Sequence, residues 1–544
     1  MTQYTRFHAK RLGAVLARVT TFAVFLAGST SCVDLTEVPV SGITSAYYTS
    51  AAGYENLMNA AYSGLHRFYA RQAGFAVTVF GTDEFTNGAD GNYKYFNLYS
   101  TQLNGDAQYV RENWDFLYQS INACNAVIDR AADAKVTDAV RAQRVAEAKF
   151  LRGLYFFDLV RQYGDIPLPL TETSSPSTVA VREPKAKVYE SILADLLAAE
   201  SVLPATQAQY GRATKGAAQH ILALVYLTRA LPGDMALSVT KAKAVIADQQ
   251  YGLVPTYKDL WDIKNEKNRE VVFAVQYTTD PLLADGGNSG HLYFTMAYEL
   301  FPGMVREIPY GRAFKRFRPT SWLLGLWDRT KDTRYEDSFQ SVWLANKAST
   351  KPKLNVGDTA IYMPNVQATS ADSATHAYTT LSQKDYTDAA FPTMTKFLDG
   401  TRLALNDTAG GKDFYVARLA ETYLIAAEAS FRDGNAAEAL RLVNVVRERA
   451  AKKGVAATSM DASLGDMSID FFLDERAREF AGEQMRWFDL VRPMPGAPNG
   501  KLAERLAKYN PIAAASFKDC FTVRPIPTTQ IERTDPPIAQ NKCY

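Results

Sequence analysis

The sequence predicts an all-α protein of stacked helical hairpins, with long loops and a few short β-strands. Between residues 53 and 250, apolar side chains recur every three or four positions through several long segments, which is the period of an amphipathic helix. A second observation is the pair of helical segments 417–432 and 436–449. In the short link between them, Gly434 is suited to end the first helix and Asn435 to cap the second. These segments therefore predict a helical hairpin.

A second hairpin is expected over residues 215–249, where two periodic segments are joined by Pro232 and Gly233. Small residues such as Ala426 and Ala427 in the other hairpin allow its helices to approach closely. Both hairpins are similar to tetratricopeptide repeats, in which neighbouring hairpins stack to bury a continuous core. The scaffold is therefore expected to be a stack of such hairpins.

The ends of individual helices are marked by capping and stop signals. Thr137 is placed to cap one long helix, and Gly164 followed by Pro167 ends it. One strand, rich in Val and Phe, is expected over 270–277, in a region of Gly, Asn and Pro-rich loops. The expected helices are 55–69, 110–132, 138–163, 186–203, 215–230, 235–249, 415–432, 436–451 and 469–491, with an irregular stretch after Pro493.

The first 31 residues are typical of a bacterial lipoprotein signal peptide, with Cys32 as the site of lipid attachment. The basic residues His8, Lys10, Arg11 and Arg18 precede an apolar stretch over 19–27, which is shorter than the about 20 residues that span a bilayer. Two alternatives remain open: an ordinary secretory peptide with a chance cysteine, or a tail anchored without cleavage. The expected parts are a signal peptide (1–31), a lipidated N-terminus and tether (32–52), an N-terminal helical part (53–250), a loop-rich region carrying the ligand face (251–412), and a C-terminal helical part with an irregular tail (413–544).

Composition excludes several classes of function. The net charge is only +2 and Lys and Arg form no dense block, so neither a nucleic-acid groove nor a polybasic membrane patch is predicted. The five His residues are scattered and no phosphate loop or zincin motif is present, so no metal site and no cofactor are expected. Besides Cys32 there are Cys124, Cys520 and Cys543, too few for a disulfide framework; whether Cys520 and Cys543 pair is left open.

Aromatic residues in loops are the candidate ligand contacts, since 12% of the chain is aromatic and 30 residues are Tyr. Aromatic faces flanked by amides or Arg suit sugar rings, whose C–H surfaces stack while their hydroxyls form hydrogen bonds. Packing, or an edge strand over 93–99, is the alternative interpretation. The candidates from loop 87–102 are Asn92, Tyr93, Tyr95, Phe96 and Tyr99, and those from segment 291–310 are Tyr293, Tyr298 and Arg306.

Charged residues elsewhere are interpreted as structural. Glu475, Arg476, Glu479, Glu483, Arg486 and Asp489 have three- and four-residue spacings, which favour ion pairs along one helix or to its neighbour. Adjacent acids such as Asp83 and Glu84 cannot face one glycosidic bond at the separation that hydrolysis requires. Trp114, Trp487, Phe488 and His220 are expected to pack in the core.

Four segments together resemble the SusD/RagB family of outer-membrane nutrient-binding lipoproteins, in the family's order and spacing over nearly the whole chain. They are Cys32-Val33-Asp34-Leu35 with Tyr47-Tyr48; Ala146-Glu147-Ala148-Lys149-Phe150-Leu151-Arg152 through Tyr163-Gly164-Asp165-Ile166-Pro167; Arg418-Leu419-Ala420-Glu421 with Ala427-Glu428-Ala429; and Glu475-Arg476 with Arg486-Trp487-Phe488-Asp489 and Pro525-Ile526-Pro527.

The resemblance implies a protein anchored by lipid at the outer-membrane cell surface through Cys32. Such a protein binds oligosaccharide or polysaccharide and delivers it to a SusC-like TonB-dependent transporter, without catalysis. The alternatives are a peptide-binding RagB-like importer component, a helical glycoside hydrolase and a tetratricopeptide adaptor. The identity of the ligand and the presence of calcium are left open.

Overall fold

The computed structural model describes residues 47–280, 282, 286–366 and 375–544. Residues 48–544 form one compact unit. The expected signal peptide and Cys32 lie outside the described residues. Within the part of the chain that is described, no helix is both long enough and apolar enough to cross a bilayer.

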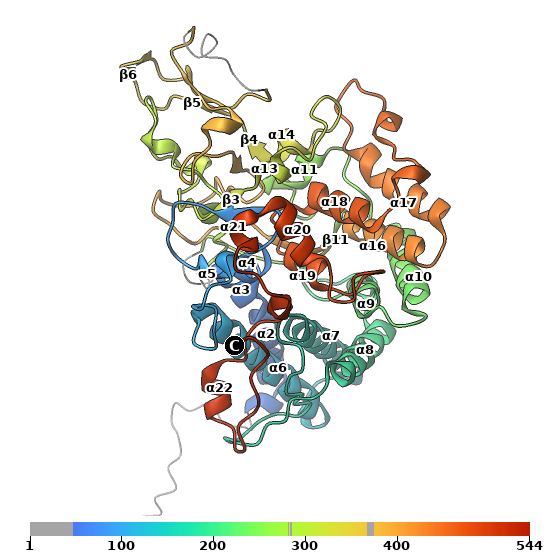
Figure 1. The fold of residues 1–544 in the computed structure, drawn as a ribbon. Coiled ribbons are helices and arrows are strands. Elements are labelled where there is room, and N and C mark those ends of the chain that lie inside the picture. Colours follow the sequence, from blue (N-terminus) through green and yellow to red (C-terminus); the bar gives the residue numbers. More distant parts are fainter. Residues whose placement is uncertain (1–46, 281, 283–285, 367–374) are drawn as a thin grey trace, which may run out of the picture. The chain divides into compact units, whose positions relative to one another are not determined.

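Helices dominate the structure, which confirms the predicted fold class (Figure 1). Successive long helices pack on one another from α6 through α10, and α16 continues the stack against α10 although the loop-rich region separates them in the chain. The longer helices are α2 (Ala51–Ser63), α6 (Gln108–Asp129), α7 (Asp138–Tyr163), α8 (Lys185–Val202), α9 (Lys215–Arg229), α10 (Asp234–Ala247), α16 (Leu419–Arg432), α17 (Ala436–Arg449) and α18 (Ile469–Phe480).

The two predicted hairpins are α9 with α10 and α16 with α17. Asn435 caps α17, because its side chain accepts a hydrogen bond from the backbone N–H of Glu438 at 3.1 Å. Thr137 caps α7 in the same way, through the N–H of Val140. Buried alanines of α16, including Ala426 and Ala427, allow the close packing that the sequence indicated. At these two helices the capping side chain marks the predicted start, whereas α2, capped by Ser50, begins four residues before the expected position 55.

The strands are short and pair locally or across long stretches of chain. β11 pairs with β2, β1 with β3, β10 with β4 and β6 with β7, all antiparallel, while β8 pairs with both β5 and β9. The strands are β1 (Phe85–Asn87), β2 (Val271–Val275), β3 (Phe317–Pro319), β4 (Phe339–Gln340), β5 (Val342–Leu344), β6 (Ser349–Thr350), β7 (Lys353–Leu354), β8 (Thr359–Tyr362), β9 (Thr379–Thr380), β10 (Thr393–Met394) and β11 (Phe414–Arg418).

Short helices fill the connections between these elements. They are α3 (Leu65–Phe68), α4 (Gln72–Thr78), α5 (Tyr95–Leu98), α11 (Tyr257–Leu260), α12 (Gly290–Tyr293), α13 (Ser321–Leu324), α14 (Arg334–Ser338), α19 (Arg486–Val491), α20 (Leu502–Tyr509), α21 (Pro511–Ala514) and α22 (Thr528–Glu532). In Figure 1, β5 and β6 lie at the upper left, away from the stacked helices α6 to α9.

Two predictions about elements were wrong. Segment 414–418 is strand β11 rather than the start of a helix, because β2, far away in the sequence, supplies a pairing partner. The helix expected over 469–491 is interrupted between α18 and α19, where Gly482 has a φ of +78°. The stretch after Pro493 is mostly irregular, as predicted, and contains the short helices α20, α21 and α22.

The apolar interior is divided into one large core and smaller clusters. The large core joins residues from α2 to the C-terminal tail and includes Trp114, Trp487 and Phe488, as predicted. A separate cluster beside β5 and β8 contains Tyr298 and Trp343. Cys520 and Cys543 form a disulfide with their Cα atoms 6.0 Å apart, which settles the pairing that the sequence left open.

Candidate functional site

The predicted loop 87–102 packs against the first turn of α6. The ring of Tyr93 stacks on Tyr109, with centroids 4.1 Å apart, and its hydroxyl donates to Gln108 Oε1 at 3.0 Å. Tyr93 has a φ of +60°, a left-handed conformation that costs a non-glycine residue on the order of 1 kcal/mol. Strain of this kind often occurs at functional sites, where surrounding contacts maintain it.

A cavity of about 410 Å³ lies beside this tyrosine stack. Its size falls in the range of ligand pockets, roughly 300–1,000 Å³. The aromatic part of its wall consists of Tyr109 and Phe116 from α6, Tyr293 from α12, and Phe314. Residues distant in sequence therefore provide a set of rings around one space.

Polar side chains occupy the rest of the wall. Gln108 and Glu112 lie one helical turn apart on α6, and Gln108 Nε2 donates to Glu112 Oε1 at 2.7 Å. The wall also contains Arg67 of α3, Arg71, and Gln72 of α4. The cavity thus combines ring faces with amide, carboxylate and guanidinium groups, as a site for a hydroxyl-rich ligand requires.

Arg316 holds the two predicted aromatic segments together from behind the wall. Its guanidinium carbon lies 5.5 Å from the ring centroid of Tyr93 and 5.1 Å from that of Tyr293. Its Nη2 donates to Asp90 Oδ2 at 2.7 Å, which balances the buried charge. Contacts of a cation with ring faces are worth about 0.5–2 kcal/mol, so Arg316 fixes the position of both rings.

The structure brings only some of the predicted ligand residues to the cavity. Tyr293 lines the cavity. Burial raises the pKa of this tyrosine, and its hydroxyl donates a hydrogen bond to Ser289. Tyr93 stands directly behind Tyr109, and Tyr95 contacts Tyr93 edge to face with centroids 6.1 Å apart. Asn92 is exposed next to this group.

Other predicted ligand residues lie elsewhere. Phe96 and Tyr99 are buried in the large core, where the Tyr99 hydroxyl donates to the carbonyl of Gly81. Tyr298 is fully buried in the separate cluster, and Arg306 binds Glu299 rather than lining the cavity. These three aromatic rings offer no exposed face to a ligand, because packing covers them. The segment 95–98 is the short helix α5, so the edge strand considered for it is not formed.

Sequence reasoning missed most of the cavity wall. Gln108, Glu112 and Phe116 recur every four residues and so share one face of α6, which was a usable signal. No comparable pattern marks Arg67, Arg71 or Phe314, because they meet the helix only through the tertiary fold.

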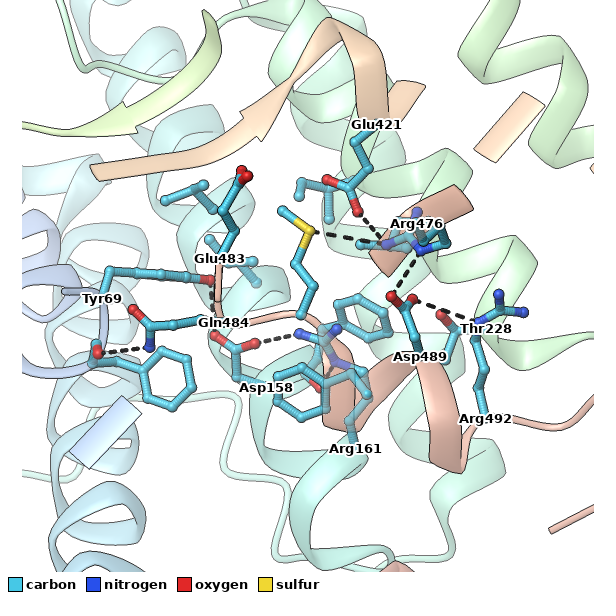
Figure 2. A pocket seen from close by; sticks show the side chains of 18 of the residues that line it. Tyr69, Asp158, Arg161, Thr228, Glu421, Arg476, Glu483, Gln484, Asp489 and Arg492 are labelled. Atoms are coloured by element: carbon cyan, nitrogen blue, oxygen red, sulfur yellow. Dashed lines mark hydrogen bonds and ion pairs between the residues drawn. The ribbon is translucent and has the colours of Figure 1, made fainter. Parts of the chain in front are cut away.

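Figure 2 shows a second cavity, of about 40 Å³, lined by charged side chains. Arg476 Nε donates to Asp489 Oδ2 at 2.7 Å and its Nη2 to Glu421 Oε1 at 2.9 Å. Burial raises the pKa of Glu421, but the hydrogen bond from His220 and the charge of Arg476 outweigh it and bring the pKa to about 2. A space this small holds a few water molecules at most, so the cluster is structural.

The motif carboxylates of α18 pair with arginines from several elements. Glu479 binds Arg334, Arg418 and Arg449. The prediction of ion pairing is confirmed, but these pairs lie in the interior rather than along the surface of one helix. His220 is also buried, between Thr422 and Glu421.

Asp83 and Glu84 hold the N-terminal and C-terminal parts of the chain together. Asp83 binds Arg486 and Arg505, and Glu84 Oε2 accepts from the N–H of Gly482 at 3.2 Å. Burial raises the pKa of Glu84 to about 8. Their contacts match the structural role expected for them.

The acidic groups of the described chain do not converge on the cavity beside the tyrosine stack. Of the described residues that line it, Glu112 is the one carboxylate, whereas glycoside hydrolysis commonly uses two. The same part of the chain holds no cluster of three or more His, Cys, Asp or Glu arranged around a metal position.

The fold and this cavity define a class of large helical-hairpin proteins with an aromatic-walled cavity between helices and loops. Two family models match the sequence: one described as "SusD family" over residues 269–544, just over half of the chain, and one described as "Starch-binding associating with outer membrane" over residues 44–227. The chain belongs to the SusD family.

Individual relatives agree with this assignment. SusD-like protein P2 of Formosa agariphila is 28% identical over 506 residues, covering 88% of this chain and 92% of that protein. A solved laminarin-binding SusD-like protein superposes with a TM-score of 0.70 at 24% identity, covering 91% of this chain and 100% of its own. Surface glycan-binding protein A of Bacteroides uniformis gives a TM-score of 0.69 at 21% identity, covering 90% and 99%. These two structures share the fold.

Proposed function

We propose that this protein binds an oligosaccharide or polysaccharide at the outer-membrane surface and delivers it to a SusC-like TonB-dependent transporter. The observation that carries the proposal is the cavity of about 410 Å³ with four aromatic residues and several polar groups in its wall. Sugar rings present C–H faces that stack on aromatic rings, while their hydroxyls exchange hydrogen bonds with amide and carboxylate groups. A carbohydrate can therefore contact both the aromatic rings and the polar groups of the wall.

Family membership supports the same function. Two fold relatives are named for laminarin binding and surface glycan binding, and one family model is described by starch binding and the outer membrane. The single carboxylate in the cavity favours binding over two-carboxylate hydrolysis. Cys32, expected to carry lipid, would keep the binder beside its transporter.

The test is isothermal titration calorimetry on the protein lacking residues 1–31, against a panel of oligosaccharides and oligopeptides. Phe116→Ala should weaken saccharide binding roughly tenfold, because losing a stacking face costs on the order of 1 kcal/mol. Phe471→Ala is the matched control: Phe471 is also half-buried and also lies under an arginine, but outside the cavity. It should leave affinity unchanged.

Saccharide binding that Phe116→Ala and Phe471→Ala reduce equally would place the site elsewhere. If the calorimeter detects binding of peptides but of no saccharide, the ligand is a peptide rather than a carbohydrate. The transporter partner is tested separately, by purifying the tagged full-length protein from its native membrane in mild detergent. Absence of a TonB-dependent barrel from that preparation would contradict the partnership.

A further inference from the structure

A further cavity, of about 530 Å³, also borders helix α3. Its size falls in the range of ligand pockets, roughly 300–1,000 Å³. Among the described residues, the two walls share no member: α3 contributes Leu65 and His66 to this cavity and Arg67 to the one beside the tyrosine stack. We call it the 209–212 cavity, after the segment that joins α2, α3 and the end of β2 in its wall.

Three aromatic side chains line the 209–212 cavity: Tyr62 of α2, His66 of α3, and Tyr210. All three are half-buried. Tyr210 is held in place, because its hydroxyl donates to the carbonyl of Glu266 at 3.1 Å and its ring centroid lies 5.3 Å from Lys267 Nζ. A ring that is already fixed loses little conformational freedom when a ligand stacks on it.

Three exposed amide side chains, those of Asn59, Gln209 and Gln276, lie in the same wall. Arg212 orders two of them, since its Nε donates to Gln209 Oε1 at 2.5 Å and its Nη2 to Asn59 Oδ1 at 3.3 Å. Among the described residues, the NH₂ groups of these two amides donate to no acceptor, and the Gln276 amide forms no hydrogen bond. The wall therefore offers both donors and an acceptor to a ligand.

Gly211 allows Gln276 and Tyr210 to border one space. Its φ is +89°, and a Cβ atom at this position would lie 3.0 Å from Gln276 Oε1 and 3.1 Å from its Cγ. A side chain there would be strained in the backbone and would press on the glutamine. Glycine thus lets segment 209–212 pass close to the end of β2.

The charge of Arg212 is balanced within the protein. Its Nη1 lies 2.9 Å from Glu147 Oε2, and its Nη2 pairs with Glu55. Arg212 therefore orders the amides rather than attracting an anion, and Lys267 adds one exposed ammonium donor. Ring faces beside amides suit a ligand with C–H surfaces and many hydroxyls, which both donate and accept.

We propose that the 209–212 cavity is a second saccharide-binding site, in which Tyr210 stacks on a sugar ring while Gln209 and Gln276 bind its hydroxyls. This inference rests on the proposed function, since it takes the ligand to be a carbohydrate. Two sites on one chain can bind two segments of one polysaccharide, which raises the apparent affinity for the polymer without any new contact.

The test combines calorimetry with amide hydrogen exchange, read by mass spectrometry, on the protein lacking residues 1–31. Maltotetraose, laminaritetraose and cellotetraose are the first probes from the oligosaccharide panel. A probe that gives a calorimetric signal should slow exchange over segment 209–212 as well as over the start of α6, because both cavities bind it.

Tyr210→Ala should raise the probe concentration needed to protect segment 209–212 about tenfold, while protection over the start of α6 stays unchanged. Tyr509→Ala is the matched control: Tyr509 is also half-buried and lies 5.0 Å from a lysine, Lys508, but outside both cavities. Gln276→Ala, at an exposed position, should weaken the same protection several-fold and repeats the test without risk to the fold.

Phe116→Ala should leave protection over segment 209–212 in place, because Phe116 lines the other cavity. Calorimetric binding without any change over segment 209–212 would overturn the inference and leave the proposed function intact. Loss of this protection to the same degree in Phe116→Ala or Tyr509→Ala as in Tyr210→Ala would overturn it too, since the site would not be separate. Absence of binding by every saccharide of the panel would overturn both proposals.

Discussion

Arginine occupies two opposite environments in this molecule. In the interior near α18, Arg418 is fully buried and contacts three carboxylates, those of Glu270, Glu479 and Glu483. At the cavity, Arg67 is exposed and its guanidinium contacts an aromatic ring. The first arrangement satisfies every charge within the protein, whereas the second leaves donors for another molecule. Counting partners therefore separates structural arginines from candidates for recognition.

The interior network depends on its completeness. Desolvation of a buried ion costs several kcal/mol and is offset only when partners of opposite charge surround it. Burial raises the pKa of Glu479, but Arg449, Arg418 and Arg334 outweigh this and lower it to about 2. The carboxylate is therefore ionised at neutral pH, and its arginines cannot be removed without a large cost.

Arg418→Ala should produce the largest loss of stability, about 3–5 kcal/mol in the free energy of unfolding, because three buried carboxylates lose a shared partner. Urea denaturation at pH 7 measures it. Arg441→Ala is the control, since Arg441 pairs with Glu438 at an exposed site and should cost under about 1 kcal/mol. Similar losses in both variants would show that burial of the network contributes little.

Glu84 should make stability fall as the pH rises from about 5 to 8. In the unfolded chain its carboxyl loses its proton near the ordinary pKa of 4.5, but burial raises the pKa in the folded protein to about 8. The folded state therefore binds more protons in this window, and each such group lowers stability by at most about 1.4 kcal/mol per pH unit.

Glu84→Gln should reduce this slope, because glutamine stays neutral in both states. Urea denaturation of the two proteins at pH 5.5 and 8 measures the difference. Glu479 has the opposite shift, so stability that depends on it is lost only as the pH falls from about 4.5 towards 2. An unchanged slope in Glu84→Gln would contradict the role of this carboxyl.

Tyr298→Phe should have the smallest effect and should separate the core from the cavity. The Tyr298 hydroxyl donates to the carbonyl of Gly311 and accepts from the N–H of Glu307, so its removal should cost about 1–2 kcal/mol in the free energy of unfolding. Saccharide affinity should change less than about twofold, because the ring lies outside the cavity. A selective loss of affinity would restore Tyr298 as a ligand residue.

Local signals predicted most of the helical scaffold. The helix expected over 138–163 matches α7 at both ends, where Thr137 caps its start and Gly164 follows its end. Capping and periodicity act within a few residues, so they can be read without the fold. Strand β11 was mistaken for helix because its partner β2 is remote in sequence, and pairing rather than local preference decides such strands.

The candidate site was predicted less completely, because it too depends on contacts between residues that are remote in sequence. Aromatic composition identified Tyr93 and Tyr293 but also selected Phe96, Tyr99 and Tyr298, which are buried. A tyrosine suits a core and a binding surface equally well, since its ring packs and its hydroxyl finds a backbone partner. Whether a ring borders a cavity distinguishes the two, since Tyr293 is buried as well, and only the folded chain defines this.

By itself, the sequence determined the stacked helical hairpins and the motif residues that resemble SusD-like proteins, because both depend on local spacing. Tertiary structure alone decided that Arg418 sits among three carboxylates while Arg67 faces a cavity. Both side chains carry the same charge, but folding assigns each its solvent exposure and its partners, and these determine whether the charge stabilises the protein or is available to a ligand.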